Sequence, residues 1–193
     1  MLMFQGCTTA LVTPFRGRRL DVAGLRRNVR FQVKGGVAGL LAAGSTGEAA
    51  ALSDSEWERV VAAVVAESRG RVPVMAGCGT NNTARSVPRL KLARKLGADA
   101  SLVVAPYYVK PTQEGLYRHF RVLHDAVDLP MVLYNIPGRS AVNVLPATVE
   151  RLARDCPRLV AVKEASGSVD QASEILARCG DRLAVLSGDD SLT

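Results

Sequence analysis

The chain has 193 residues, of which 48% are hydrophobic and 22% charged, so it is too apolar for a disordered protein and long enough for one well-packed domain. Its formal net charge is +7, but the basic residues are scattered along expected helices, which disfavours a nucleic-acid-binding protein. Four cysteines without C-x-x-C spacing, beside only two histidines, make a zinc site improbable and fit reduced thiols in the cytoplasm. We also expect no signal peptide and no membrane span, because no apolar run approaches the roughly 20 residues that cross a bilayer.

Seven short apolar runs are predicted to form buried strands, at residues 9–12, 37–43, 72–76, 101–105, 131–134, 159–163 and 183–187. Between them lie amphipathic stretches that begin with helix-capping residues. Ser53 and Glu56 form a capping box ahead of an apolar face, and Ser168 with Gln171 repeats that spacing. Further expected N-caps are Asp21, Thr83 and Thr112, and expected helix stops are Gly35, Gly97 and Gly180.

Uniformly apolar strands joined by helices predict a parallel sheet that is covered on its faces, in a single α/β domain over residues 1–193. A doubly wound sheet and a (β/α)8 TIM barrel both fit this alternation. Polar residues follow five different strands, which favours the barrel, since a doubly wound sheet concentrates them at one switch point. The sequence stops shortly after the seventh run, so we expect a barrel that is incomplete at its C-terminus.

Lys163 ends the sixth apolar run, where a buried strand seldom carries a cation, because desolvating an unpaired ammonium costs several kcal/mol. That same desolvation favours the neutral amine, which can attack a carbonyl carbon. The alternative interpretation is a structural lysine that reaches solvent or forms an ion pair with Glu164.

Three other strand ends carry polar residues with a possible role in binding. The turn at residues 44–48 offers the hydroxyls of Ser45 and Thr46 and exposed amides suited to a small carboxylate, or else a plain strand-to-helix turn. Residues 134–139 end in Arg139, a guanidinium suited to a carboxylate or simply facing solvent after a Pro-Gly turn. For Tyr107 and Tyr108, a pair of tyrosines at a strand end, packing at an interface is the favoured interpretation.

The combination of these motifs resembles the dihydrodipicolinate synthase (4-hydroxy-tetrahydrodipicolinate synthase) family of pyruvate-dependent Schiff-base aldolases. The resemblance covers essentially the whole chain, through the motifs at residues 10–15, 44–48, 106–108, 113–117, 134–139, 163–165 and 187–190. It implies a lyase of lysine and diaminopimelate biosynthesis that condenses pyruvate with L-aspartate 4-semialdehyde. It also implies a homotetramer built as a dimer of dimers, without a metal or a separate cofactor.

By this resemblance Lys163 forms the imine with pyruvate, and Tyr134 is the general acid/base. Its proton passes through Ser45 and through Tyr108, which the neighbouring subunit contributes in the family. Thr46 is implied to hold the pyruvate carboxylate.

The resemblance further implies that Arg139 binds the carboxylate of the aldehyde substrate and that Gly188 belongs to the substrate-binding set. Two positions depart from the family pattern of lysine feedback inhibition, since Trp57 and Arg85 stand where a His and a Glu are usual. Because Arg85 is a cation where the ammonium of lysine would bind, we expect no such inhibition, although Asn81 is retained.

Two alternatives to this activity stay open on the sequence. Sibling aldolases that act on N-acetylneuraminate or on 2-keto-3-deoxy sugar acids share the lysine and tyrosine, although Arg139 favours the aspartate semialdehyde reaction. The other alternative is a non-catalytic, truncated barrel that serves as a binding or regulatory module.

Overall fold

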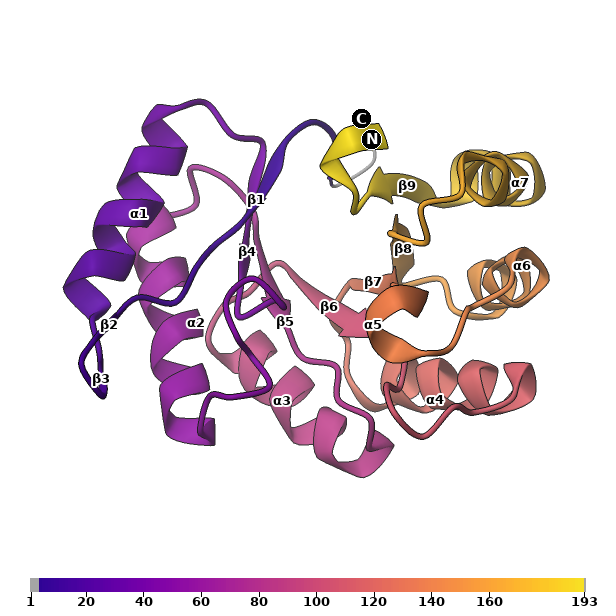
Figure 1. Cartoon of the computed structure of the whole chain (residues 1–193), viewed down its shortest axis with the longest axis horizontal. Helices are drawn as coiled ribbons and strands as arrows, with labels where there is room; N and C mark the ends of the chain where they lie inside the picture. The colour runs from indigo at the N-terminus through magenta and orange to yellow at the C-terminus, as the bar shows by residue number, and fades with distance from the viewer. Residues whose placement is uncertain (1–3, 193) are drawn as a thin grey trace.

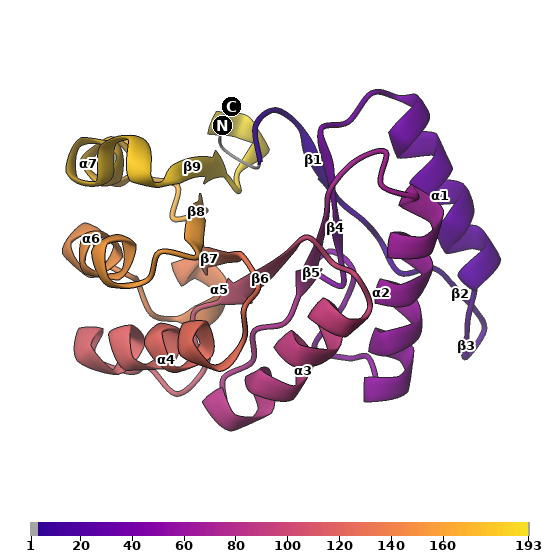
Figure 2. The same ribbon diagram turned by 180° about the vertical axis from the view of Figure 1, so that it is seen from behind.

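The computed structural model describes residues 4–192, which form a curved parallel sheet with helices on its outer side (Figures 1 and 2). The sheet has seven strands in the order β1-β4-β5-β6-β7-β8-β9, so each strand pairs with the next one along the chain apart from the hairpin β2–β3. Their bounds are β1 Thr8–Ala10, β4 Gly39–Ala42, β5 Val74–Gly77, β6 Ala100–Val104, β7 Met131–Asn135, β8 Leu159–Glu164 and β9 Ala184–Ser187. All seven predicted strands are confirmed, and the arrangement is that of a (β/α) barrel whose edge strands are β1 and β9.

Helices connect successive strands and cover the convex face of the sheet (Figure 1). They are α1 Val22–Lys34, α2 Asp54–Ser68, α3 Thr83–Lys95, α4 Gln113–Ala126, α6 Pro146–Asp155 and α7 Val169–Cys179, with the short α5 Pro137–Ser140 following β7. Two 3-10 turns, η1 Gly180–Arg182 and η2 Asp190–Leu192, flank β9. Within the described residues, none of these helices combines the length and the apolar character needed to cross a bilayer.

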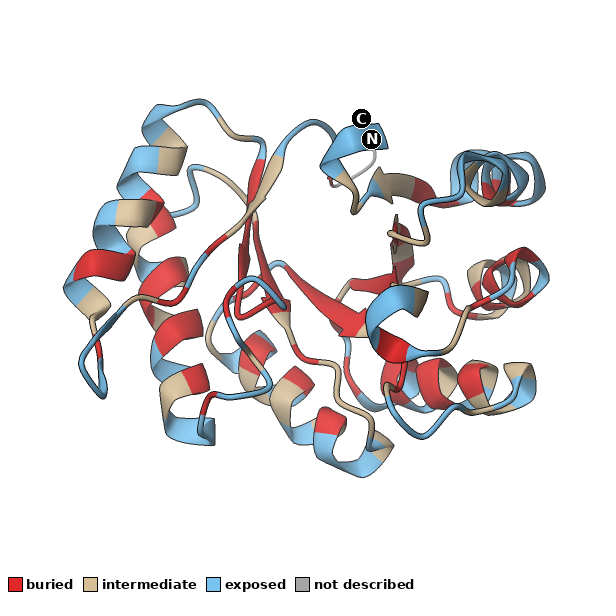
Figure 3. Ribbon diagram, viewed as in Figure 1, coloured by how far each residue is buried: buried red, intermediate tan, exposed pale blue. Residues whose placement is uncertain are grey.

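The core has two parts, separated by the sheet, as the buried positions in Figure 3 indicate. Between the sheet and the helices lies the larger cluster, which includes Leu133, Val162 and Trp57. On the concave side lies a smaller cluster that includes Tyr134 and Ala161. Because side chains alternate along a strand, this division fixes which residues of β7 and β8 face the barrel interior.

Most predicted helix caps are confirmed, and two need correction. Ser53 and Glu56 form the reciprocal capping box of α2. The N-cap of α3, however, is Asn82 and not Thr83, because the Asn82 carboxamide accepts from the amide of Arg85 while the Thr83 hydroxyl lies 2.8 Å from Nδ1 of His119. Ser168 caps α7, but its box is only half formed.

Two segments between the predicted elements contain regular structure. The basic segment at residues 16–19 lies in an antiparallel hairpin, in which β2 Phe15–Arg16 pairs with β3 Arg19–Leu20. Its turn is made by Gly17, whose φ of +59° favours glycine. Pro137 begins the short helix α5, because the fixed φ of proline suits the first helical position.

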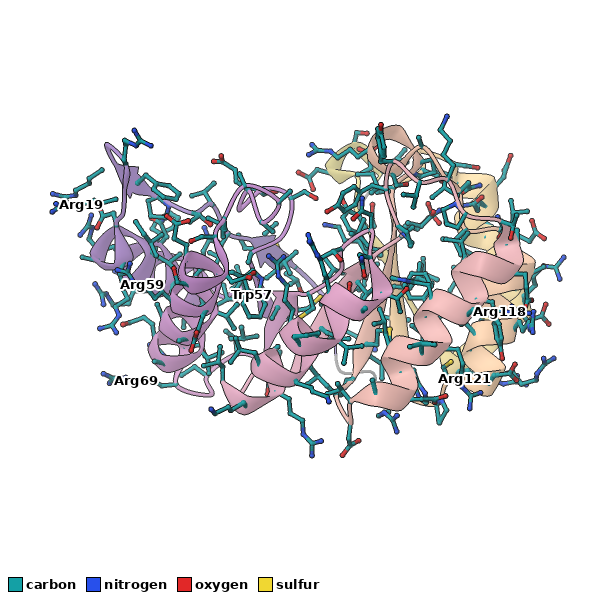
Figure 4. All side chains as sticks on the ribbon, turned by 90° about the horizontal axis from the view of Figure 1, so that it is seen from below. Arg19, Trp57, Arg59, Arg69, Arg118 and Arg121 are labelled. Carbon is teal, nitrogen blue, oxygen red and sulfur yellow. The ribbon has the colours of Figure 1, made fainter. Side chains whose placement is uncertain are left out.

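The basic residues are spread over the outer surface. Figure 4 labels five arginines at the periphery of the molecule, on the hairpin, on α2 and just beyond it, and on α4: Arg19, Arg59, Arg69, Arg118 and Arg121. Arg118 and Arg121 form ion pairs within α4 with Glu114 and Asp125. This distribution leaves the positive charge dispersed over the elements and not gathered in one stripe.

Candidate active site

The C-terminal ends of β7 and β8 bring Tyr134 and Lys163 together. These residues are register partners in adjacent parallel strands, so both side chains project from the same face of the sheet. The Lys163 Nζ lies 4.5 Å from the centroid of the Tyr134 ring. Tyr134 is buried and belongs to the concave cluster, which places the amine at the mouth of the barrel interior.

The surroundings of Lys163 favour its neutral form. Burial lowers the pKa of the Lys163 ammonium; the negative charge of Asp190 opposes this shift and the positive charge of Arg139 adds to it. Burial raises the pKa of the Tyr134 phenol, while Arg139 and the nearby Ser45 side chain oppose that shift. At neutral pH the site therefore pairs a lysine that loses its proton more readily with a tyrosine that keeps its own.

Gly188 lies against the Lys163 side chain. A Cβ atom at this position would lie 2.9 Å from Cε of Lys163 and 2.7 Å from Cβ of Ala165. Its amide donates to the backbone carbonyl of Glu164, which fixes the turn after β9 next to β8. The absence of a side chain at Gly188 thus leaves room for the alkyl chain of Lys163.

A cavity of about 390 Å³ opens beside Tyr134, and its lining includes Ser45, Tyr134 and Arg139. Ser45 lies in the turn after β4, and Arg139 lies on α5. The amides of Ser45 and Thr46 donate to no acceptor within residues 4–192, so they remain available to a ligand. A cavity that combines guanidinium, hydroxyl and phenol groups beside an amine suits small anionic carbonyl compounds.

The tight turn after β4 depends on a close approach of two backbones. A Cβ at Gly77 of β5 would lie only 1.9 Å from the carbonyl oxygen of Ala43, so no larger residue fits there. Ala43 itself has a φ of +51°, which turns the chain sharply into the residues that line the cavity.

Of the seven predicted site residues, Ser45, Tyr134 and Arg139 line the cavity. Lys163 lies against Tyr134 and Gly188 against Lys163, outside that lining. Thr46 and Tyr108 do not line the cavity. Thr46 is exposed next to Ser45. Tyr108 is 85% exposed and has a φ of +72°, and it is the preceding Tyr107 that lines the cavity. In a strand-end tyrosine pair, the sequence alone does not reveal which ring turns inward.

The structure also adds residues that the sequence did not single out. Glu48, Arg89 and Ile136 line the same cavity. Arg89 comes from α3, and its guanidinium lies 5.7 Å from the centroid of the Trp57 ring. No strand-end motif marks a helical arginine of this kind, so no signal in the sequence could have identified it.

A second cavity of about 710 Å³ adjoins the first and contains the two positions that depart from the family pattern. Trp57, Asn81 and Arg85 all line it. Trp57 projects from α2 toward α3 (Figure 4), and its indole Nε1 donates to the carbonyl of Gly77 at 2.8 Å. Trp57 is therefore a fixed wall of this cavity, and Arg85 provides a positive charge there.

Lys163 does not form the ion pair with Glu164 that the sequence left open. The two side chains project from opposite faces of β8, and Glu164 accepts hydrogen bonds only from the neutral donors Asn135, Gln171 and Ser166 among the described residues. This removes the main structural alternative for a lysine at the end of the strand.

Comparison with known proteins agrees with this architecture. The family model for the dihydrodipicolinate synthetase family matches residues 3–193. A 4-hydroxy-tetrahydrodipicolinate synthase from Pelobacter propionicus is 53% identical over 99% of this chain, and the chain covers 66% of that relative. A crystal structure of dihydrodipicolinate synthase from Aquifex aeolicus superposes with a TM-score of 0.96 at 44% identity, covering 98% of this chain and 65% of the other.

A further solved structure, described as a monomeric dihydrodipicolinate synthase variant, has a TM-score of 0.96 at 42% identity and covers 99% of this chain and 65% of that one. The chain thus spans slightly less than two thirds of the length of these relatives. Across nearly all of its own length it shares their sequence and their fold, and it belongs to the dihydrodipicolinate synthetase family.

Proposed function

We propose that this chain carries the 4-hydroxy-tetrahydrodipicolinate synthase reaction, the condensation of pyruvate with L-aspartate 4-semialdehyde. The observation that carries the proposal is the half-buried amine of Lys163, 4.5 Å from the Tyr134 ring centroid and beside a cavity that contains Arg139. The names of relatives at about 50% identity support the same activity. The covalent intermediate is a Schiff base, so the organic chemistry needs no separate cofactor.

In the first half of the reaction, the neutral amine of Lys163 attacks the keto carbon of pyruvate, and loss of water gives a protonated imine. The pKa of Lys163 is lowered mainly by burial, which increases the fraction of amine available for this attack. Tyr134 moves protons to the departing hydroxyl and from the methyl carbon, because its phenol is next to the amine. The product of these steps is the enamine.

In the second half, the enamine carbon forms a bond to the aldehyde carbon of the semialdehyde, whose oxygen takes up a proton. The amino group of the new chain then attacks the imine carbon and displaces Lys163, which closes the ring. We assign Arg139 to the carboxylate of the aldehyde substrate, since a guanidinium binds a carboxylate through two parallel hydrogen bonds. Thr46 and the free amides beside it, together with Gly188, are assigned to the pyruvate end.

We also propose that the proton relay extends from Tyr134 through Ser45 to Tyr108 of a second copy of the chain. Tyr108 is exposed and does not line the cavity of its own chain, which leaves it available to a neighbour. A homotetramer, as a dimer of dimers, would supply that neighbour. Sedimentation velocity of the 193-residue chain tests this assembly, and a monomer with full activity would contradict the shared relay.

Borohydride trapping tests the covalent step. After incubation with pyruvate and borohydride, intact-mass measurement is expected to show one reduced pyruvyl adduct per chain, and peptide mapping should locate it at Lys163. Lys163→Ala is expected to lose the adduct, whereas Lys110→Ala, which changes an exposed lysine outside the cavity, is expected to keep it. An unmodified wild-type chain would contradict the activity and leave the non-catalytic alternative.

A second measurement separates the proposed substrate from those of the sibling aldolases. With pyruvate present, turnover of aspartate semialdehyde is compared with that of N-acetylmannosamine. Faster turnover of the sugar would contradict the assignment of Arg139 while leaving the pyruvate imine intact.

A further inference from the structure

The strands that carry Lys163 and Tyr134 bear a second polar pair on their opposite face. Asn135 and Glu164 are the next register partners along β7 and β8. Because side chains alternate, these two point toward the helices, on the same side as Val162 and Leu133. Asn135 is fully buried, and Glu164 is 6% exposed.

Glu164 is held entirely by neutral donors. Its Oε1 accepts from the amide of Ser166 at 2.7 Å and from Nδ2 of Asn135 at 3.2 Å. Its Oε2 accepts from the same Nδ2 at 3.0 Å and from Nε2 of Gln171 at 2.9 Å. No cationic side chain lies within 4.0 Å of this carboxylate among residues 4–192. A buried charge without a counter-ion requires all its hydrogen bonds, so the donors around it are fixed in position.

The same network reaches the segment that carries Arg139. Oδ1 of Asn135 accepts from the amide of Val144 at 2.9 Å, and its Nδ2 donates to Oδ1 of Asn143 at 2.7 Å. Asn143 in turn exchanges hydrogen bonds with Gln171. The segment from β7 through α5 is therefore attached at both ends to one buried cluster, since Asn135 lies before Arg139 and Asn143 after it.

A network of this kind contributes more to geometry than to stability. Replacing buried polar or ionic groups by apolar ones of similar volume is often neutral or stabilising, so burial of Glu164 has no obvious advantage for folding alone. Its hydrogen bonds instead link the backbone next to the Lys163 amine, the strand of Tyr134 and the segment that contains Arg139. These are the three groups whose mutual placement the proposed reaction requires.

We propose that Glu164 is a positioning residue that holds Lys163, Tyr134 and Arg139 in register by binding Asn135, Gln171 and the Ser166 amide. The proposal rests on the proposed function, since it concerns the efficiency of imine formation at Lys163. Glu164 itself faces away from the reacting atoms and takes no part in proton transfer.

Glu164→Gln tests the proposal with almost no change of shape. The Glu164 carboxylate accepts hydrogen bonds at both oxygens. In the variant, the side-chain NH2 group takes the place of one oxygen and faces groups that are themselves donors. If Asn135 rotates to accept from the new amide, its nitrogen then faces the Val144 amide, which loses its acceptor. No single rotation satisfies the whole cluster, so the relative position of the three site groups is expected to change.

The readout is the rate of borohydride trapping at saturating pyruvate, measured together with the pyruvate concentration that gives half of that rate. For Glu164→Gln we expect the saturated rate to fall by about tenfold or more and the half-saturating concentration to change by less than about threefold. Val162→Ala is the matched control, because Val162 is fully buried on the same face of β8 and makes no polar contact. Its saturated rate is expected to stay within about twofold of wild type, even if its melting temperature falls further.

Equal saturated trapping rates for Glu164→Gln and wild type would overturn the proposal. It would also be overturned if Val162→Ala lost as much of this rate as Glu164→Gln at the same loss of melting temperature. If Glu164→Gln does not fold, Gln171→Leu decides by the same criteria, because it removes one donor to Glu164 at the edge of the cluster. A wild-type chain that traps no pyruvate would overturn the proposed function and this inference together. If borohydride traps pyruvate on the wild-type chain and on Glu164→Gln at the same rate, the inference alone is overturned and the proposed function stands.

Discussion

At the scale of single residues, Gly188 provides the clearest link between backbone and chemistry. Gly188→Ala places a methyl group 2.7 Å from Cβ of Ala165 and 2.9 Å from Cε of Lys163. The Cβ of Ala165 cannot rotate away, so the backbone at this contact must shift, and the contact with Cε forces the lysine to move as well. Displacing a reacting group by about 1 Å can cost on the order of a hundredfold in rate. We therefore expect pyruvate trapping by Gly188→Ala to slow by about tenfold or more.

Gly138→Ala is the control for this substitution. Gly138 lies on α5 near the same cavity, and a Cβ there meets no atom within 4 Å. The trapping rate of this variant is expected to match that of wild type. If both alanine variants trap pyruvate at the wild-type rate, the space beside Lys163 is larger than the structure indicates.

The charge of Arg139 shifts the pKa values of Lys163 and Tyr134, in addition to the contact that we propose with the second substrate. For Arg139→Ala we expect weaker use of aspartate semialdehyde, with the half-saturating concentration raised about tenfold or more, because a charge-assisted bidentate contact is lost. The charge of Arg139 lowers the pKa of Lys163. Its removal raises that pKa, so the pH at which trapping reaches half its maximum is expected to move upward, while trapping at alkaline pH is retained.

Arg139→Lys separates these two effects. Lysine keeps the positive charge but not the planar fork, so the pH midpoint of trapping is expected to stay near that of wild type while aldehyde binding still weakens. An equal loss of pyruvate trapping and aldehyde use in both variants would make Arg139 a structural residue.

At the scale of elements, the start of α2 determines how the cavity loop joins its helix. Ser53 accepts from the amide of Glu56, and the Glu56 carboxylate accepts from the amide of Ser53 at 2.9 Å. Ser53→Ala removes the side-chain half of this box, the acceptor for the Glu56 amide, while the backbone amide at position 53 can still donate to Glu56. We expect it to lower the free energy of unfolding by about 1 kcal/mol. Ser55→Ala is the control, since the Ser55 hydroxyl contacts only that of Ser53. Urea denaturation curves of the two variants measure the difference; equal losses would contradict the capping role.

The strands and most caps could be predicted because their causes are local. An apolar run such as residues 159–163 specifies a buried strand wherever it lies, and a Ser-x-x-Glu box acts within four residues. The same locality explains the errors. Thr83 has the chemistry of a cap but forms a hydrogen bond with His119, which is distant in sequence, so Asn82 takes its place.

The site was predictable to the extent that strand ends converge in a barrel. Lys163 and Tyr134 lie near the C-terminal ends of β8 and β7, and Arg139 comes just after β7, so their meeting follows from the topology. The Glu164 network was not predictable, because a glutamate next to Lys163 in the sequence is equally compatible with an ion pair between the two side chains. Only the register of β7 against β8 shows that Glu164 faces Asn135 on the other side of the sheet.

At the scale of the whole molecule, His119 is expected to make stability depend on pH. It is buried on α4, where its Nδ1 lies 2.8 Å from the Thr83 hydroxyl and its Nε2 has no partner among the described residues. Burial lowers the pKa of His119 from 6.5 to about 4. Between these two values the unfolded chain binds a proton that the folded chain does not, so protonation favours unfolding.

The free energy of unfolding is therefore expected to fall as the pH is lowered from about 6.5 to about 4, with a contribution from this group on the order of 3 kcal/mol. His119→Gln keeps a side chain that can bind Thr83 but removes the titration. Its unfolding free energy, from urea curves at several pH values, should fall less steeply over this window than that of wild type. His124→Gln serves as the control, because it removes the other histidine of the chain, whose Nδ1 lies 2.8 Å from the Asp125 carboxylate. If the unfolding free energy of His119→Gln falls as steeply with decreasing pH as that of wild type, the carboxylates alone govern acid unfolding, since they too are protonated in this range.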